Sequence, residues 1–151
     1  MKALFVISQE RFKREAADFC LSHLKKSDEV IAVYILDSGF SARVESFLCE
    51  NTFVADKPSE SVTQALREEY EQRAEVCLQR LKEEFTSHGI SCKIYVKSGE
   101  YQFVLKDLVG EFSPDLVVVS EKKRSRLMRL LGRSEAKKFQ KLLHGVEVQI
   151  F

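Results

Sequence analysis

Residues 30–39, VIAVYILDSG, hold seven consecutive apolar side chains followed by a turn sequence. A strand that meets solvent on one side alternates apolar and polar residues, and this run does not alternate. The run therefore predicts a β-strand that is buried on both faces and ends at a turn over residues 37–39. Such strands are typical of parallel sheets with helices on both sides.

Other strands and helices alternate along the chain on either side of this run. Two further apolar runs lie at residues 4–7, LFVI, and 116–119, LVVV, and alternating strand patterns cover residues 90–96 and 146–151. Apolar residues recur at helical spacing between these strands, over residues 12–24, about 59–87, 100–112 and 121–143, with a short helix expected within 38–60.

This strict alternation of strand and helix predicts right-handed crossovers. The expected fold class is α/β, with a doubly wound open sheet of five parallel strands and helices on both faces. A chain of 151 residues has room for one such domain, over residues 1–151. Its content of 44% hydrophobic and 31% charged residues is typical of a folded globular protein.

The cysteines and the N-terminal residues indicate in which cellular compartment the protein is expected. Four cysteines, at positions 20, 49, 77 and 92, form no C-x-x-C pair and have no histidine at metal-binding spacing. The apolar run near the N-terminus is too short for a signal peptide, and no run of 18 apolar residues occurs. We therefore expect free thiols, no bound metal, a cytoplasmic location and no membrane partner.

Basic charge is concentrated late in the chain. Residues 1–120 carry 15 basic and 20 acidic side chains, whereas residues 121–151 carry nine basic and three acidic ones. The basic segment is either a solvated helix surface or an anion site in which arginine side chains hold a phosphate. It lacks interleaved aromatic residues and a known recognition motif, so a nucleic-acid partner is not expected.

Residues 114–119, PDLVVV, and 124–131, RSRLMRLL, resemble the C-terminal half of universal stress proteins. In that family a strand of this kind is followed by a loop, a basic segment rich in leucine, and a glycine with serine or threonine. The order of elements and the chain length fit the family as well. The resemblance implies an adenine-nucleotide-binding fold, a role in the stress response and, often, a homodimer.

The phosphate loop departs from the family pattern. In the ATP-binding branch the pattern is G-x2-G-x9-G-S/T, and its glycines let backbone N–H groups approach the phosphates. Ser120, Lys123 and Arg133 stand here at the three glycine positions, and only Ser134 matches. Ser8 stands where the family has an acidic residue after the first strand. The resemblance therefore implies the branch without tight ATP binding; no cofactor is assigned, and ATP or AMP is the alternative.

Open parallel sheets bind ligands at the carboxyl ends of their strands, where the strand order reverses. The ligand or phosphate site expected there comprises Ser8, Ser120, Lys123, Arg124, Arg126, Arg133 and Ser134, with Asp37 and Gly99 at the pocket rim. The alternatives are that Ser8 caps the first helix, that Asp37 belongs only to a turn, and that Gly99 serves a strand-to-helix turn. The sequence has no nucleophile elbow or P-loop lysine, so no catalytic residue is assigned and no enzyme activity is expected.

The final strand predicts an assembly. Val146, Val148 and Ile150 alternate with other residues, and no proline protects the strand. An unprotected edge strand is a template for pairing with another chain. The resemblance implies a homodimer in which this strand pairs antiparallel with its twin about a two-fold axis. The alternative is a monomer in which the strand is covered.

Three functions remain open from the sequence. The first is a regulatory or binding module similar to universal stress proteins, without catalysis. The second is an ATP- or AMP-binding member in which basic side chains replace the loop glycines. The third is a protein–protein interaction module, in which residues 38–60, with Phe40, Phe47 and Phe53, dock on a partner.

Overall fold

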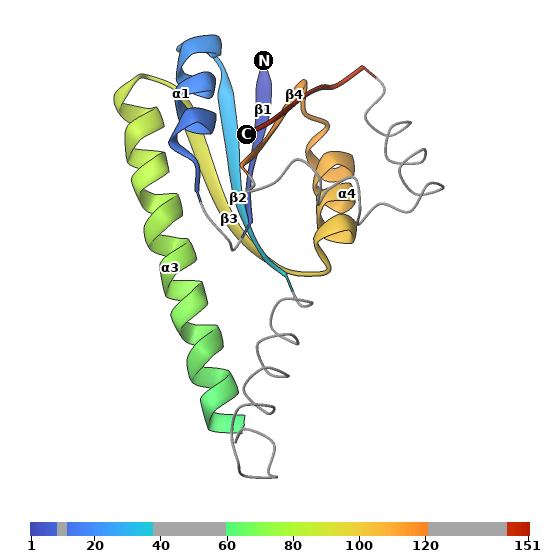
Figure 1. Cartoon of the computed structure of the whole chain (residues 1–151). Coiled ribbons are helices and arrows are strands. Elements are labelled where there is room, and N and C mark those ends of the chain that lie inside the picture. Colours follow the sequence, from blue (N-terminus) through green and yellow to red (C-terminus); the bar gives the residue numbers. More distant parts are fainter. Residues whose placement is uncertain (9–11, 38–59, 121–144) are drawn as a thin grey trace.

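The computed structural model describes residues 1–8, 12–37, 60–120 and 145–151. Its centre is a five-stranded sheet with the order β3-β2-β1-β4-β5, in which every neighbouring pair is parallel (Figure 1). The strands are β1 (Lys2–Ser8), β2 (Glu29–Asp37), β3 (Ser91–Gly99), β4 (Leu116–Ser120) and β5 (Glu147–Ile150). The expected α/β fold class is confirmed.

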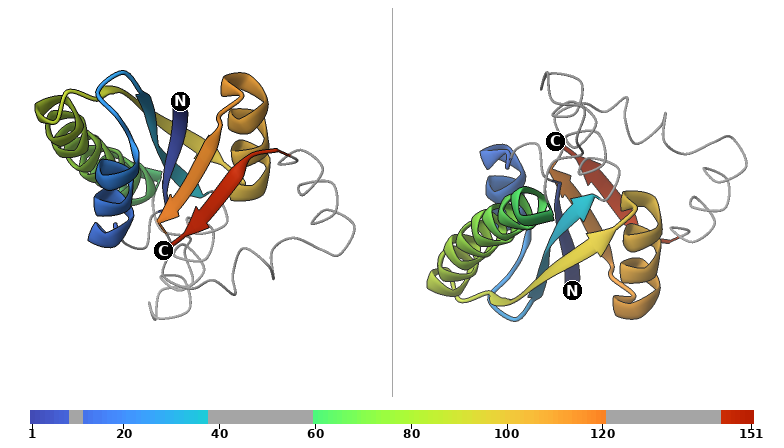
Figure 2. Two further views of the ribbon diagram at one scale, coloured as in Figure 1. Left: turned by 90° about the horizontal axis from the view of Figure 1, so that it is seen from above. Right: turned by 90° about the horizontal axis from the view of Figure 1, so that it is seen from below.

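Helices cover both faces of the sheet. Two helices, α1 (Arg14–His23) and α3 (Glu60–Ser87), lie on one face, and α4 (Tyr101–Phe112) lies on the other (Figure 2). Within the described ranges, no helix is both long and apolar enough to cross a membrane. The helix expected over residues 121–143 and the short helix expected within 38–60 lie outside the described residues.

The apolar runs are continuous because alternate residues of one strand enter two different cores. In β1, Phe5 and Ile7 pack in the cluster beneath α1 and α3, whereas Leu4 and Val6 pack in the cluster beneath α4. Phe5 also meets Phe85 of α3 edge to face, with 6.2 Å between the ring centroids. Burial on both faces therefore leaves residues 3–7 of β1 no position for a polar side chain.

The ends of two strands differ from those predicted from the sequence, because pairing with a neighbouring strand determines where a strand ends. The strand expected over residues 90–96 extends to Gly99, because β3 stays paired with β2 up to the Asp37–Gly99 position. The final strand is shorter than expected, at Glu147–Ile150. These changes do not alter the order of elements along the chain.

The interpretation of Ser8 as the cap of the first helix is wrong. Ser8 is the last residue of β1 and pairs with Ile35 of β2, while α1 begins only at Arg14. Lys13 occupies the cap position, and no side chain caps the helix there. Because its pairing keeps Ser8 in β1, Ser8 lies six residues before the start of α1 and cannot cap that helix.

The start of the chain is fixed by a buried carboxylate. Asp28 accepts a hydrogen bond from the N-terminal ammonium at 2.7 Å and another from the backbone N–H of Lys25 at 2.7 Å. The bond from the ammonium, followed by the bond from Lys25, lowers the pKa of the Asp28 carboxyl. Because Asp28 directly precedes β2, these bonds tie the starts of β1 and β2 together.

We predict that Asp28→Asn weakens the fold at neutral pH and flattens its acid dependence. A carboxyl whose folded pKa lies below its unfolded value of about 3.9 stabilises the fold above that value, and the contribution disappears as the pH falls through the folded pKa. Urea unfolding midpoints at about pH 7 and about pH 2 measure the effect. The urea midpoint of the wild type should fall more between about pH 7 and about pH 2 than that of the variant. Equal falls would contradict the stabilising role of the Asp28 carboxylate.

Candidate functional site

The strand order reverses between β1 and β4. From β1 the chain proceeds outward through β2 to β3 and then returns to β4 on the opposite side of β1. Ligands of open α/β sheets bind outside the carboxyl ends of strands at this point. Ile7 pairs with Ser120, and Ser8 follows Ile7. The structure therefore brings Ser8 and Ser120 together at the predicted position.

Ser120 is fully buried, and its hydroxyl is already engaged. The Ser120 Oγ atom accepts a hydrogen bond from the backbone N–H of Lys13 at 2.8 Å. Lys13 immediately precedes α1, so the bond ties the end of β4 to the start of that helix. Sequence reasoning missed Lys13, because a backbone group that acts across 107 positions leaves no pattern in the sequence.

The N-terminus of α1 lies beside this bond. Its cap residue, Lys13, has an extended backbone and supplies no side-chain cap, and Glu15 lies in the first turn. The first N–H groups of a helix have no intrahelical partners, and the helix dipole places partial positive charge there. This end of α1 favours an anion electrostatically, while the acidic Glu15 opposes one.

Asp37 and Gly99 lie at the same edge of the sheet, opposite one another at the ends of β2 and β3. Asp37 is half-buried. Gly99 has φ +147°, a conformation that side-chain-bearing residues rarely adopt, and α4 begins two residues later. The conformation of Gly99 supports the interpretation that it serves the strand-to-helix turn.

Several predicted residues cannot be placed. Lys123, Arg124, Arg126, Arg133 and Ser134 lie outside the described residues, as do Cys49 and the phenylalanines expected to dock a partner. Val146, Val148 and Ile150 are half-buried against the core cluster beneath α4. Val148 and Ile150 belong to β5, which Val146 directly precedes, and β5 is the outermost strand on its side of the sheet, as predicted.

The described thiols are unsuited to nucleophilic chemistry. Burial raises the pKa of Cys20 to about 12 and that of Cys92 to about 11. Burial also raises the pKa of Cys77, which is half-buried. A thiol with a raised pKa stays protonated at neutral pH and reacts slowly. Among the described residues, no group of acidic, histidine or cysteine side chains is arranged to hold a metal ion.

A cavity of about 690 Å³ lies between α1 and α3, and its described lining includes none of the predicted site residues that the structure describes. Its described lining combines apolar and charged side chains from the start of α1 and one face of α3: Phe12, Arg14, Glu69, Gln72, Arg73, Val76, Cys77, Arg80, Leu81 and Glu84. The signal in the sequence was Val76, an apolar residue off the main stripe of its helix with arginines at positions 73 and 80. We call this cavity the α1–α3 groove.

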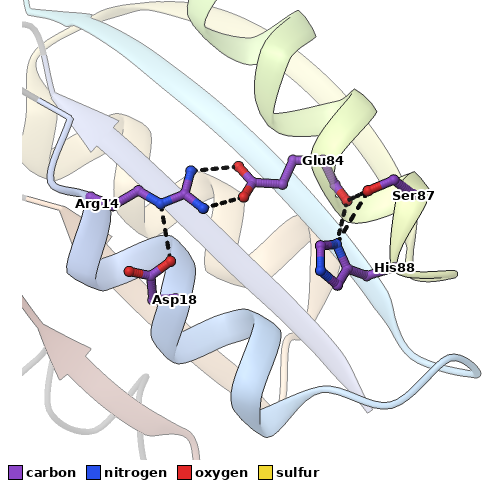
Figure 3. Close-up of polar contacts among 5 residues, drawn as sticks. All are labelled: Arg14, Asp18, Glu84, Ser87 and His88. Atoms are coloured by element: carbon purple, nitrogen blue, oxygen red, sulfur yellow. Dashed lines mark hydrogen bonds and ion pairs between the residues drawn. The ribbon is translucent and has the colours of Figure 1, made fainter.

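Two residues that line the α1–α3 groove, Arg14 and Glu84, belong to an ion-pair cluster that joins α1 to α3 (Figure 3). The Arg14 guanidinium bonds both carboxylate oxygens of Glu84, and its Nε atom bonds Asp18 at 3.0 Å. A bidentate arginine–carboxylate pair fixes orientation as well as distance. The cluster therefore sets how α1 and α3 lie against one another.

Comparison with known proteins identifies the family. A family model described as "Universal stress protein family" matches residues 1–139. No curated protein matched the chain.

Solved structures share the fold at low sequence identity. Hypothetical protein MJ0577 has 16% identity and a TM-score of 0.66, with 99% of this chain and 93% of that chain covered. A universal stress protein family protein from Burkholderia pseudomallei has 14% identity and a TM-score of 0.59, with 98% and 94% covered. A family protein from Arabidopsis thaliana, solved with AMP bound, has 12% identity and a TM-score of 0.60, with 100% and 91% covered. Identities this low establish the fold alone.

We predict that Gly99→Ala destabilises the protein by about 1–3 kcal/mol, because its φ of +147° is strained for alanine. The added Cβ would also lie 2.9 Å from Val104 Cγ2. The matched control is Gly110→Ala within α4, where a Cβ meets nothing within 4 Å. Alanine should stabilise that helix by about 0.5–1 kcal/mol. Urea unfolding measures both changes in the free energy of unfolding. An unchanged stability in Gly99→Ala would contradict the φ of +147° at Gly99.

Proposed function

This chain belongs to the universal stress protein family, and on that premise we propose that it is a regulatory or binding module of the stress response that does not bind ATP tightly. The observation that carries this proposal is the partly buried hydrogen bond that the Lys13 N–H donates to Ser120 Oγ. In the ATP-binding pattern the position of Ser120 is a glycine, which leaves backbone N–H groups accessible to phosphate.

The bond acts against a phosphate in two ways. It places a side chain where the family pattern has none, and it occupies the Lys13 N–H, one of the donors that an anion at the start of α1 would use. At the neighbouring strand end, Ser8 is uncharged where the pattern has an acid. A nucleotide would therefore have to displace an existing hydrogen bond at the edge where the family pattern places it.

A role without catalysis is part of the proposal. The described thiols carry raised pKa values, which suits packing rather than nucleophilic attack. A binding module needs only a surface that recognises a ligand or a partner. An enzyme also needs an activated group beside the ligand.

The second candidate is an ATP- or AMP-binding protein in which basic side chains replace the loop glycines. The observation in its favour is the N-terminus of α1, which has no side-chain cap and begins close to the reversal of strand order. The Arabidopsis thaliana protein of the same fold was solved with AMP bound. Arg133 and its basic neighbours would supply the phosphate contacts in this case.

Isothermal titration calorimetry separates the two candidates. We predict that nucleotide-stripped protein gives no saturable heat with Mg-ATP, and then with AMP, up to millimolar concentration. Micromolar binding that disappears in Arg133→Ala would overturn the proposal and establish the second candidate. Micromolar binding that survives this substitution would also overturn it and would place the phosphate contacts on other groups.

We propose in addition that the chain forms a homodimer through β5. The Glu147 N–H donates a hydrogen bond to the carbonyl oxygen of Asp115, the residue before β4. The Phe151 N–H donates one to the carbonyl oxygen of Val119 in β4. The backbone N–H and C=O groups of alternate residues point to opposite edges of a strand. Glu147 and Phe151 point theirs toward β4, so Val148 and Ile150 point theirs away from the sheet. These outward groups support antiparallel pairing with a second copy about a two-fold axis.

The opposite edge of the sheet is protected from such pairing. There β3 carries Lys93 and Lys97, and Lys93 forms an ion pair of 2.7 Å with Glu29. Charged lysines on an edge strand discourage pairing with another chain. By contrast, β5 carries no lysine. The difference between the edges therefore favours β5 as the interface.

We predict that the wild type has twice the 17.4 kDa chain mass in light scattering at tens of micromolar, and that Val148→Pro is a folded monomer. Proline removes an N–H that faces outward, and it keeps the bonds to β4. The matched control Val148→Ala trims the same side chain, retains the N–H and should stay dimeric. A monomeric wild type, or a dimeric Val148→Pro, would remove the proposed interface.

A further inference from the structure

The floor of the α1–α3 groove is apolar and partly open to water. Leu81 is buried, and Phe12 and Cys77 are half-buried. Val76 is 53% exposed even though it lies inside the groove. Water in contact with such a surface is released when an apolar ligand covers it, which favours binding. The floor is thus suited to a ligand with an apolar body.

The charged groups of the groove leave one positive charge without a partner. Both carboxylate oxygens of Glu84 bond Arg14 (Figure 3), and Glu69 bonds Arg73 at 2.5 Å. Arg80 also lines the groove, and within the described part of the chain it forms no ion pair. The acids one turn along the helix are Glu83 and Glu84. Glu83 accepts a hydrogen bond from Gln79, and Glu84 is paired with Arg14.

Arg80 lines the groove together with Cys77, which is part of the apolar floor. The two residues are three positions apart on α3, so they lie on the same side of the helix. The positive charge of Arg80 also partly opposes the rise that burial causes in the pKa of the Cys77 thiol. Among the described residues, one cation without an ion-pair partner thus stands beside the apolar floor.

The dimensions suit a long, narrow ligand. The lining residues of α3 run from Glu69 to Glu84, which corresponds to about 22 Å of helix. The volume of about 690 Å³ falls within the range of roughly 300–1,000 Å³ found for small-molecule pockets. An acidic peptide helix would need several free cations, whereas this groove offers one among its described residues.

We propose that the α1–α3 groove binds a long-chain carboxylate, with the acyl chain on Phe12, Val76 and Leu81 and the carboxylate on Arg80. The acyl chain removes the exposed Val76 from water. The carboxylate meets the planar fork of the arginine, which matches its geometry. Within the described ranges, this site shares no residue with the predicted nucleotide site, so the proposal does not depend on whether a nucleotide binds.

Fluorescence titration of the full, delipidated chain with cis-parinaric acid, a fluorescent long-chain carboxylate, tests the proposal. We expect a saturable rise in fluorescence that palmitate reverses and that hexadecanol, its uncharged counterpart, reverses far less. Absence of a saturable rise in the wild type would overturn the proposal. Equal competition by palmitate and hexadecanol would overturn the role of Arg80.

Three variants place the ligand. Val76→Asp puts a charge on the floor at an exposed position and should abolish saturable binding without unfolding the protein. Arg80→Gln should weaken carboxylate binding by on the order of tenfold through loss of a charge-assisted hydrogen bond. The matched control Arg67→Gln lies on the exposed surface of the same helix, outside the groove, and should bind like the wild type. Undiminished binding by Val76→Asp, with circular dichroism unchanged, would overturn the site.

Cys77 supplies an independent readout. In a Cys49→Ser background, the remaining thiols are Cys77 and the buried Cys20 and Cys92. Palmitate should slow the modification of Cys77 by a thiol reagent such as dithionitrobenzoate, because an acyl chain on the floor covers the sulfur. An unchanged rate at saturating palmitate would show that the carboxylate binds elsewhere and would overturn the assignment.

Discussion

The central position of β1 is the constraint on which the rest of the structure depends. It pairs with β2 on one side and β4 on the other, and residues 3–7 are completely buried. A strand without an exposed face needs cover on both sides, so α1 and α3 must lie on one face and α4 on the other. The reversal of strand order at β1, and with it the candidate ligand-binding edge, accompanies this arrangement.

The sequence was sufficient for the fold because apolar patterns report burial directly. The run at residues 30–36 has no polar member and could only be a strand covered on both faces. It was also sufficient to place Ser8, Ser120, Asp37 and Gly99 at one edge, since the carboxyl ends of parallel strands coincide. Element ends were less predictable: β3 reaches Gly99 because of its pairing with β2, which no local pattern records.

What the sequence could not supply were contacts between distant residues. The bond from the Lys13 N–H to Ser120 Oγ uses a backbone donor that every residue except proline has, so nothing at position 13 announces it. The same holds for the α1–α3 groove. Arg14 and Glu84 are ordinary charged helix residues until the fold places them opposite one another. Once they are paired, Arg80 has no ion-pair partner in the part of the chain that the structure describes.

Three consecutive residues connect the two places where a ligand is proposed or considered. Phe12 lies on the groove floor and packs on Phe5 of β1, the N–H of Lys13 bonds Ser120 at the sheet edge, and Arg14 clamps Glu84 of α3. A ligand that displaced the Lys13 bond would act on a segment whose neighbours on both sides line the groove. The edge and the groove are therefore joined by contacts of three consecutive residues, so a change in the position of one of them acts directly on the other two.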